Sequence, residues 1–265
     1  MMKIGVLQFQ PQFGEVEANV NRAVELLAAT YWDLVVLPEL FNTGYQFVAS
    51  EELTRQAEAI PNGYTTECLI KIAQQQQGYI VAGIAEKAAE RFYNSVVLVG
   101  PQGYLGHYRK VHLFYEEKLW FQPGDGGFKI YDIGLAKIGL MICFDWIFPE
   151  VARTLALQGA DILCHPANLV LPYCQDAMIT RAIENRVFTA TANRIGAEKR
   201  GNQNELHFTG QSQIVDPKGN LLFRLETDTE ELKVVEVDPA EARDKWLNVH
   251  NHIFKDRCPE VYALG

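Results

Sequence analysis

The sequence contains no long apolar run and no excess of positive charge. None of its hydrophobic stretches approaches the roughly 18 residues that a membrane-spanning helix needs, and the N-terminal MMKIGVLQF is too short and too polar for a signal peptide. We therefore expect no membrane partner. The chain has 24 Lys and Arg residues against 33 Asp and Glu residues, a net charge of −9. This charge argues against nucleic acid as a partner, because such binding depends on cationic side chains that neutralise phosphates.

Paired cysteine motifs and metal-binding motifs are also missing. The five cysteines are odd in number and include no C-x-x-C pair, which argues against a disulfide framework or a cysteine-rich zinc site and favours a reducing, cytoplasmic location. His250 and His252 form an H-x-H pair without an H-x-x-x-H motif or an acidic cluster, so we expect no metal and no cofactor. No serine lies in a G-x-S-x-G motif, which argues against a serine hydrolase.

Apolar runs and helical patterns alternate along the chain, which indicates an α/β fold. The segments typical of buried strands are 3–9, 33–37, 79–85 and 95–100, and those with helical spacing of apolar residues are 15–30 and 65–77. No linker rich in Pro, Gly or Ser and no change in composition divides the sequence. We therefore predict a single domain over residues 1–265.

The two halves of the chain repeat the same order of elements. KIG at 3–5 opens a strand in the first half, and KIG at 137–139 opens one in the second. Segments 94–109 and 210–225 both read as hairpins that turn on Pro-x-Gly. The alternative is that these short matches arise by chance, but the order and type of the elements agree as well. Two related halves, each a small sheet with helices on one face, predict a four-layer αββα sandwich.

Three residues with reactive side chains lie at the ends of predicted strands. Cys143 follows the strand at 136–142 and precedes a helix with Pro149 in its first turn. We expect its thiol to be exposed at the sheet edge, near a helix N-terminus that favours the thiolate. Glu39 directly follows the strand at 33–37, and Lys110 closes the first hairpin. Taken singly, these residues could equally be a buried structural cysteine, a solvated glutamate and a surface lysine.

In combination, the segments LPE (37–39), YRK (108–110) and CFDWIFPE (143–150) resemble the motifs of the nitrilase superfamily, also called carbon–nitrogen hydrolases. The resemblance extends along nearly the whole chain. It implies an αββα sandwich built from two related halves, which agrees with the internal repeat. It also implies a catalytic triad consisting of Glu39, Lys110 and Cys143.

This resemblance implies a reaction that the three side chains can perform. A free cysteine has a pKa near ~8.5 and is mostly protonated at neutral pH. Glu39 can take the proton of Cys143, whose sulfur then attacks the carbonyl carbon of an amide. Lys110 and the backbone N–H of Phe144 can stabilise the oxyanion that forms. Neither a metal nor an organic cofactor takes part in this scheme.

Further residues are expected around the triad. The family keeps a second glutamate shortly after the lysine, and Glu117 is the counterpart that we favour, although the sequence does not separate it from Glu116. We expect Glu117 to orient Lys110 or the attacking water. The residues that we expect to line the substrate pocket are Tyr45, Phe144, Trp146 and Asn168.

The substrate implied by the resemblance is a small amide, which would be cleaved to a carboxylic acid and ammonia. Typical nitrilases of the family carry Trp-Glu after the nucleophile, whereas this chain has Phe144-Asp145. That difference favours the amidase and N-carbamoyl-amine hydrolase branches. The alternative is a compact microbial nitrilase that converts a small nitrile with the same triad. A non-catalytic binding protein of the same fold is a more distant alternative, because all three triad residues are present.

The family usually forms dimers through helices near the nucleophile. We therefore expect a homodimer or a higher homo-oligomer. The C-terminal stretch 246–265 is too long to be the end of a strand. We expect it to pack across a partner subunit.

Overall fold

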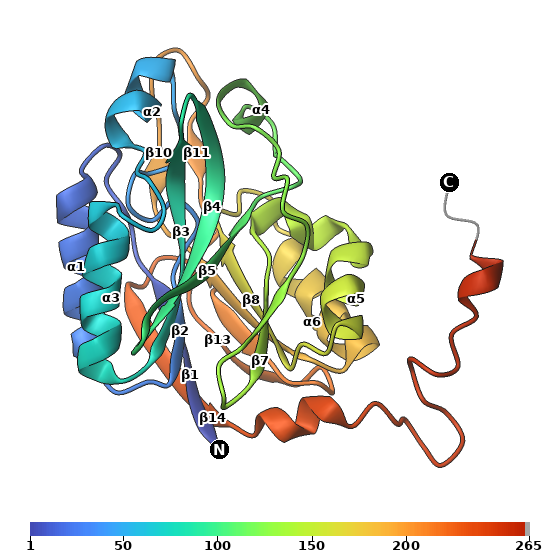
Figure 1. The fold of residues 1–265 in the computed structure, drawn as a ribbon. Coiled ribbons are helices and arrows are strands. Elements are labelled where there is room, and N and C mark those ends of the chain that lie inside the picture. The colour runs from blue at the N-terminus through green and yellow to red at the C-terminus, as the bar shows by residue number, and fades with distance from the viewer. Residues whose placement is uncertain (263–265) are drawn as a thin grey trace.

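Two six-stranded sheets form the centre of the protein in the computed structural model, which describes residues 1–262 (Figure 1). In sheet order, the first contains β14 (Glu231–Val237), β1 (Met2–Gln8), β2 (Leu34–Val36), β3 (Tyr79–Ala88), β4 (Arg91–Gly100) and β5 (Gly103–Arg109). The second contains β13 (Leu221–Arg224), β12 (Gln213–Val215), β9 (Phe188–Asn193), β8 (Ile162–Ala167), β7 (Lys137–Leu140) and β6 (Ile130–Asp132). A separate pair is formed by β10 (Ala197–Glu198) and β11 (Leu206–His207).

Helices cover the outer faces of both sheets. The first sheet is covered by α1 (Val16–Ala28) and α3 (Tyr64–Gln76), and α5 (Pro149–Leu157) and α6 (Cys174–Asn185) lie on the opposite side of the molecule (Figure 1). Shorter helices lie in the connections: α2 (Ser50–Gln56), α4 (Glu117–Trp120), η1 (Cys143–Ile147), η2 (Pro239–Arg243) and η3 (Pro259–Val261). The layers therefore follow the predicted αββα order. No helix among the described residues has both the length and the apolarity that crossing a membrane requires.

The internal repeat is confirmed by the strand pairing. In the first half β1, β2 and β3 are parallel, and β4 and β5 follow as an antiparallel hairpin. In the second half β7, β8 and β9 are parallel, and β12 and β13 follow in the same antiparallel arrangement. Each sheet then gains one antiparallel edge strand, β14 beside β1 and β6 beside β7.

The hydrophobic core has separate layers because successive side chains of a strand point to opposite faces. In β2, Leu34 and Val36 belong to the apolar cluster that includes residues of the second sheet, whereas Val35 packs in the cluster with α1 and α3. All three side chains are fully buried. A parallel strand covered on both faces is expected to be apolar throughout, which explains the short run of apolar residues seen in the sequence.

The chain after η2 leaves the body of the protein (Figure 1). Its apolar side chains are largely open to solvent; Leu247 is 60% exposed and Val249 is 85% exposed. This segment forms most of the stretch 246–265 that we expect to cross a partner subunit, and residues 263–265 of that stretch lie outside the described residues.

Gly83 in β3 packs directly against the backbone around Glu39. A Cβ atom at this position would lie 2.5 Å from Glu39 Cα and 2.9 Å from Leu40 N. We expect Gly83→Ala to lower the free energy of unfolding by roughly 1–3 kcal/mol, as overpacking of a buried site does. Urea denaturation will measure this change. Gly126→Ala is the control, since a Cβ there meets no atom within 4 Å; equal unfolding midpoints for the two variants would contradict the prediction.

Candidate active site

Lys110 lies fully buried between two carboxylates. It follows β5, and its Nζ is 2.7 Å from Glu39 Oε1 and 2.7 Å from Glu117 Oε1. Burial by itself would lower the pKa of Lys110, but Glu117 and Glu39 outweigh that effect and raise the pKa above its ordinary value. Lys110 is therefore an ammonium ion. Two of its three N–H donors bind these carboxylates.

Glu39 lies just beyond the end of β2 and is fully buried. Its Oε1 accepts hydrogen bonds from Lys110 and, at 2.7 Å, from Asn94 Nδ2 of β4. Its Oε2 has no hydrogen-bond partner among the described residues. The next residue, Leu40, has a φ of 48°, a left-handed conformation that is rare for a residue with a side chain. One carboxylate oxygen is thus fixed by two donors, and the other is available for a proton.

Glu117 begins α4, and hydrogen bonds reach both of its carboxylate oxygens. Besides Lys110, Oε1 accepts the hydroxyl of Tyr45 at 2.9 Å, and Oε2 accepts the backbone N–H of Phe114 at 3.0 Å. Burial, reinforced by Glu39 and opposed by Lys110, raises the pKa of Glu117 to about 7. Both Glu116 and Glu117 line a neighbouring cavity, but the ion pair with Lys110 is made by Glu117. The structure therefore brings Glu117, rather than Glu116, to Lys110.

Cys143 is the first residue of η1, at the sharp turn that follows β7. Its φ is 40°, again in the left-handed region. The side chain is buried, with 5% exposure, so the expectation of a thiol exposed at the sheet edge is wrong. Burial, with a further contribution from Glu39, raises the pKa of Cys143 well above its ordinary value, although Lys110 acts in the opposite direction. The expected preference for a thiolate is therefore also wrong, and the resting thiol carries its proton.

His165 of β8 holds the backbone of this turn. Its imidazole Nε2 lies 2.9 Å from the carbonyl oxygen of Cys143, and Nδ1 lies 3.1 Å from Thr191 Oγ1. Because a carbonyl oxygen only accepts hydrogen bonds, Nε2 carries the proton and Nδ1 accepts the hydroxyl of Thr191. Burial lowers the pKa of His165, which keeps the ring neutral. His165 thus ties the strained turn to β8.

Asp145 joins the cysteine turn to β5, the strand that directly precedes Lys110. Its Oδ2 accepts the backbone N–H of Ile142 at 2.8 Å and the hydroxyl of Tyr108, in β5, at 2.9 Å. Its Oδ1 lies 2.8 Å from His112 Nδ1, and the His112 ring stacks on Phe148 with 3.8 Å between ring centroids. These contacts fix the position of Cys143 relative to the segment of Lys110.

A cavity of about 20 Å³ borders the thiol, slightly more than the roughly 10–15 Å³ that one water needs. It is lined by Phe114, Cys143, Phe144, Trp146, Asn168, Leu169, Val170 and Leu171. Three of the four residues expected to line the substrate pocket are therefore here, whereas Tyr45 lies on the side of Glu117, in a second cavity. The side-chain amide of Asn168 is buried, and neither its oxygen nor its nitrogen has a partner among the described residues. The cavity wall is otherwise mainly apolar.

Sequence reasoning missed three buried polar residues of the site, which are Asn94, Asp145 and His165. Each interrupts or follows a largely apolar run, and a buried polar group needs a partner. That signal was present in the sequence, but it did not identify the partners. Among residues 1–262, no three His, Cys, Asp or Glu side chains are grouped as metal ligands would be.

The amino-acid sequence is similar to those of a nitrilase and an amidase. A nitrilase from Pyrococcus abyssi (strain GE5 / Orsay) is 50% identical over 265 residues, covering 99% of both chains. An (R)-stereoselective amidase from a Pseudomonas species is 37% identical over 242 residues, covering 89% of this chain and 85% of the relative.

A solved structure and a family model agree with these relatives. The crystal structure of a carbon-nitrogen hydrolase from Helicobacter pylori G27 matches with a TM-score of 0.87 and 27% identity, covering 98% of this chain and 97% of the other. The family model described as Carbon-nitrogen hydrolase matches residues 3–245, which include Glu39, Lys110 and Cys143. The chain belongs to the carbon–nitrogen hydrolase family and is a hydrolase of that class.

Proposed function

We propose that the protein cleaves the carbon–nitrogen bond of a small amide through a thioester on Cys143. The observation that carries this proposal is a buried ammonium between two carboxylates, Glu39 and Glu117, beside a protonated thiol. Such a cluster can move a proton, stabilise an oxyanion and supply a nucleophile without any other group.

In the first half of the reaction, the free oxygen of Glu39 takes the proton of Cys143 while the sulfur attacks the carbonyl carbon. The oxyanion is stabilised by the third N–H of Lys110 and the backbone N–H of Phe144. When the tetrahedral intermediate collapses, Glu39 gives its proton to the nitrogen, because an amide anion is a very poor leaving group. Ammonia departs, and the acyl group remains on the sulfur.

In the second half, water attacks the thioester and Glu39 takes its proton. The carbon–sulfur bond then breaks, the carboxylic acid is released, and the sulfur regains a proton from Glu39. Glu117 keeps Lys110 in place through both halves, since its carboxylate accepts hydrogen bonds from Lys110, Tyr45 and Phe114. The unpartnered amide of Asn168 borders the thiol, where it can bind a polar atom of the substrate.

A nitrile is the second candidate substrate, and one observation favours it. The relative that is 50% identical over nearly its whole length is named a nitrilase. The chemistry differs only at the start, because the sulfur adds to the nitrile carbon to give a thioimidate. Water then adds to the thioimidate and ammonia leaves, which yields the same thioester. Nitriles therefore enter the substrate test beside amides.

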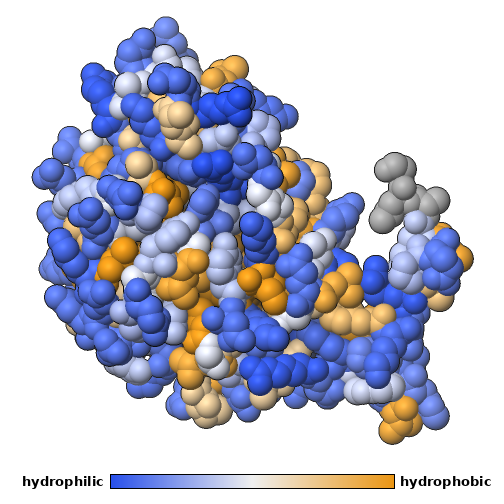
Figure 2. Space-filling view, viewed as in Figure 1, coloured by the Kyte–Doolittle hydropathy of each residue, from blue (hydrophilic) through white to orange (hydrophobic). Residues whose placement is uncertain are grey.

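We also propose that the protein forms a homodimer through the side that carries η1, α5 and α6. Ile147 of η1, Tyr173 directly before α6 and Ile183 of α6 are 43%, 63% and 48% exposed. Figure 2 shows apolar surface on this side of the molecule and near the start of the projecting C-terminal segment. Burying these side chains against a second copy would remove apolar surface from water.

Ammonia release from a panel of small amides, N-carbamoyl amines and aliphatic nitriles tests the reaction. We expect Cys143→Ala to lose roughly 10³-fold or more of the rate, because the nucleophile is gone. Glu39→Gln should lose about 10²–10⁴-fold, as removal of a general acid–base does. Cys68→Ala is the control, because Cys68 lies on α3, and it should keep the wild-type rate. Unchanged release by Cys143→Ala would contradict the mechanism, and a preference for nitriles would establish the second candidate.

The pH dependence of kcat/KM tests the role of Glu117. The carboxylate that binds Lys110 is the ionised form, and the pKa of Glu117 is raised to about 7. We therefore expect activity to be high above pH 7 and to fall as the pH drops below it, when Glu117 takes up a proton. Glu117→Gln should be slower and lack this acid limb, whereas Glu116→Gln should retain it. A flat profile between pH 5.5 and 8 in the wild type would show that Glu117 has no such role.

Light scattering at micromolar concentration tests the assembly. We expect a dimer or a larger oligomer, because the apolar side chains named above need cover. Tyr173→Glu beside the start of α6, 63% exposed, should shift the population toward monomer, and Leu119→Glu on α4, 69% exposed, should not. A monomeric wild-type protein would rule out the proposed interface.

A further inference from the structure

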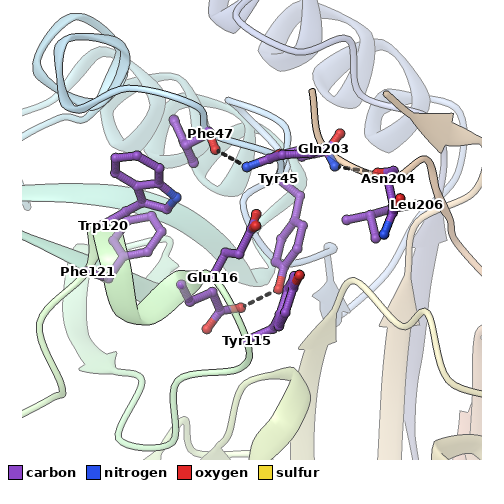
Figure 3. Close-up of a pocket in the computed structure, with 11 residues that line it drawn as sticks. Tyr45, Phe47, Tyr115, Glu116, Trp120, Phe121, Gln203, Asn204 and Leu206 are labelled. Carbon is purple, nitrogen blue, oxygen red and sulfur yellow. Dashed lines mark hydrogen bonds between the residues drawn. The ribbon is translucent and has the colours of Figure 1, made fainter. Parts of the chain in front are cut away.

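A second cavity adjoins the catalytic cluster on the side of Glu117. It measures about 160 Å³, close to the roughly 150 Å³ of a cavity known to take a benzene ring. Figure 3 shows Trp120 and Phe121 on one side of it, Tyr45 and Tyr115 on the other, and Gln203 across one end. The cavity thus has the size for about six heavy atoms, and aromatic side chains make up much of its wall.

The two glutamine side chains of this cavity present hydrogen-bond acceptors. Gln46 is 4% exposed, and its Nε2 donates to the carbonyl oxygen of Asn204 at 2.8 Å. Gln203 Nε2 donates to the carbonyl oxygen of Phe47 at 3.2 Å. These bonds fix both amide orientations, because only the nitrogen of an amide can donate. The Oε1 atoms of Gln46 and Gln203 are buried without a partner among the described residues.

All charged side chains among the described lining residues of this cavity are acidic. The carboxylates of Glu116 and Glu117 line the cavity, and none of its described lining residues is Lys, Arg or His. Among the buried side-chain donors of the lining in the described part of the chain, only the indole N–H of Trp120 lacks a partner. Acceptors and negative charge therefore predominate. The ligand that complements them is a cation with several N–H donors and a short apolar body.

We infer that this cavity binds a small primary alkylammonium ion. Its ammonium group is held by Gln46 Oε1, Gln203 Oε1 and the Glu116 carboxylate. Its alkyl chain packs against the aromatic walls of Tyr45, Phe47 and Phe121. Neutral alcohols lack the charge, and carboxylates carry the wrong one.

The cavity and the catalytic cluster share one residue, Glu117. This carboxylate lines the cavity and also accepts the hydrogen bonds of Lys110 and Tyr45. The ammonium can belong to the nitrogen side of a substrate or to a free amine. The binding itself does not depend on the reaction proposed above.

Calorimetry on the full-length Cys143→Ala protein tests the binding without turnover. n-Butylammonium chloride is titrated at constant ionic strength and compared with n-butanol and sodium butyrate. We expect butylammonium to bind at least about tenfold more tightly than butanol, the factor that one charge-assisted hydrogen bond supplies, and butyrate to bind more weakly still. Equal affinities for butylammonium and butanol would overturn the inference.

Two further variants in the same background locate the site. Glu116→Gln and Gln203→Leu should each weaken butylammonium binding by roughly tenfold, because each loses one contact to the ammonium. Glu90→Gln, an exposed carboxylate in the β3–β4 turn, is the matched control and should bind as Cys143→Ala does. Thermal melts verify that every variant is folded. If folded Glu116→Gln and Gln203→Leu both retain full affinity, the ammonium binds elsewhere and the inference fails.

Kinetics with the wild-type enzyme distinguish the two sources of the ammonium. If the substrate carries the ammonium, an N-(4-ammoniobutyl) amide should have a KM at least about tenfold below that of the N-butyl amide. Glu116→Gln should then remove this difference in KM. If the ammonium belongs to a free amine, the two amides should have equal KM values. Added butylammonium should then change the kcat for a neutral amide. If the wild type hydrolyses neither amide, that result counts against the proposed reaction alone. The calorimetry still shows whether the cavity binds an alkylammonium ion.

Discussion

The candidate active site depends on the two carboxylates that compensate the buried ammonium of Lys110. Taking an isolated charge into the interior of a protein costs several kcal/mol after relaxation, so Lys110 is tolerated only because Glu39 and Glu117 lie within 2.7 Å of its Nζ. These carboxylates come from the end of β2 and the start of α4, and the lysine follows β5. Asn94 and Tyr45 supply further donors to the same two carboxylates. The first half of the chain must fold completely to assemble this cluster.

The second half presents the thiol to it. A left-handed φ in a residue other than glycine costs on the order of 1–3 kcal/mol, and both Leu40 and Cys143 adopt one. The turn at Cys143 is fixed from two sides, by His165 on its carbonyl oxygen and by Asp145, which reaches Tyr108 of β5. Asp145 therefore connects the two halves of the repeat where their chemistry must meet. The strain at Cys143 is sustained by contacts from both sheets.

The fold and the contact between Glu39 and Lys110 could be predicted because they depend on local signals. Apolar runs, the repeated order of elements and the motifs around Glu39, Lys110 and Cys143 all lie within short segments of sequence. The state of the thiol could not be predicted, because its burial depends on segments such as that of Phe114 closing over it. The partners of Asn94 and His165 depend on which strand ends lie side by side. Tyr45 was expected to line the substrate pocket, and its contact with Glu117 follows from a loop conformation that the sequence pattern does not reveal.

In the proposed reaction, the burial of Cys143 explains why the thiol keeps its proton until attack. The proposed reaction begins with two carboxylates and one ammonium in this cluster, a net charge of one negative. A thiolate formed by loss of the proton to water would add a second charge in a region of low dielectric, which is unfavourable. Transfer of the proton to Glu39 keeps the total unchanged, because a carboxylate is neutralised as the thiolate forms. The proposed reaction therefore couples deprotonation to attack, and the acid it creates at Glu39 is the one that the departing nitrogen needs.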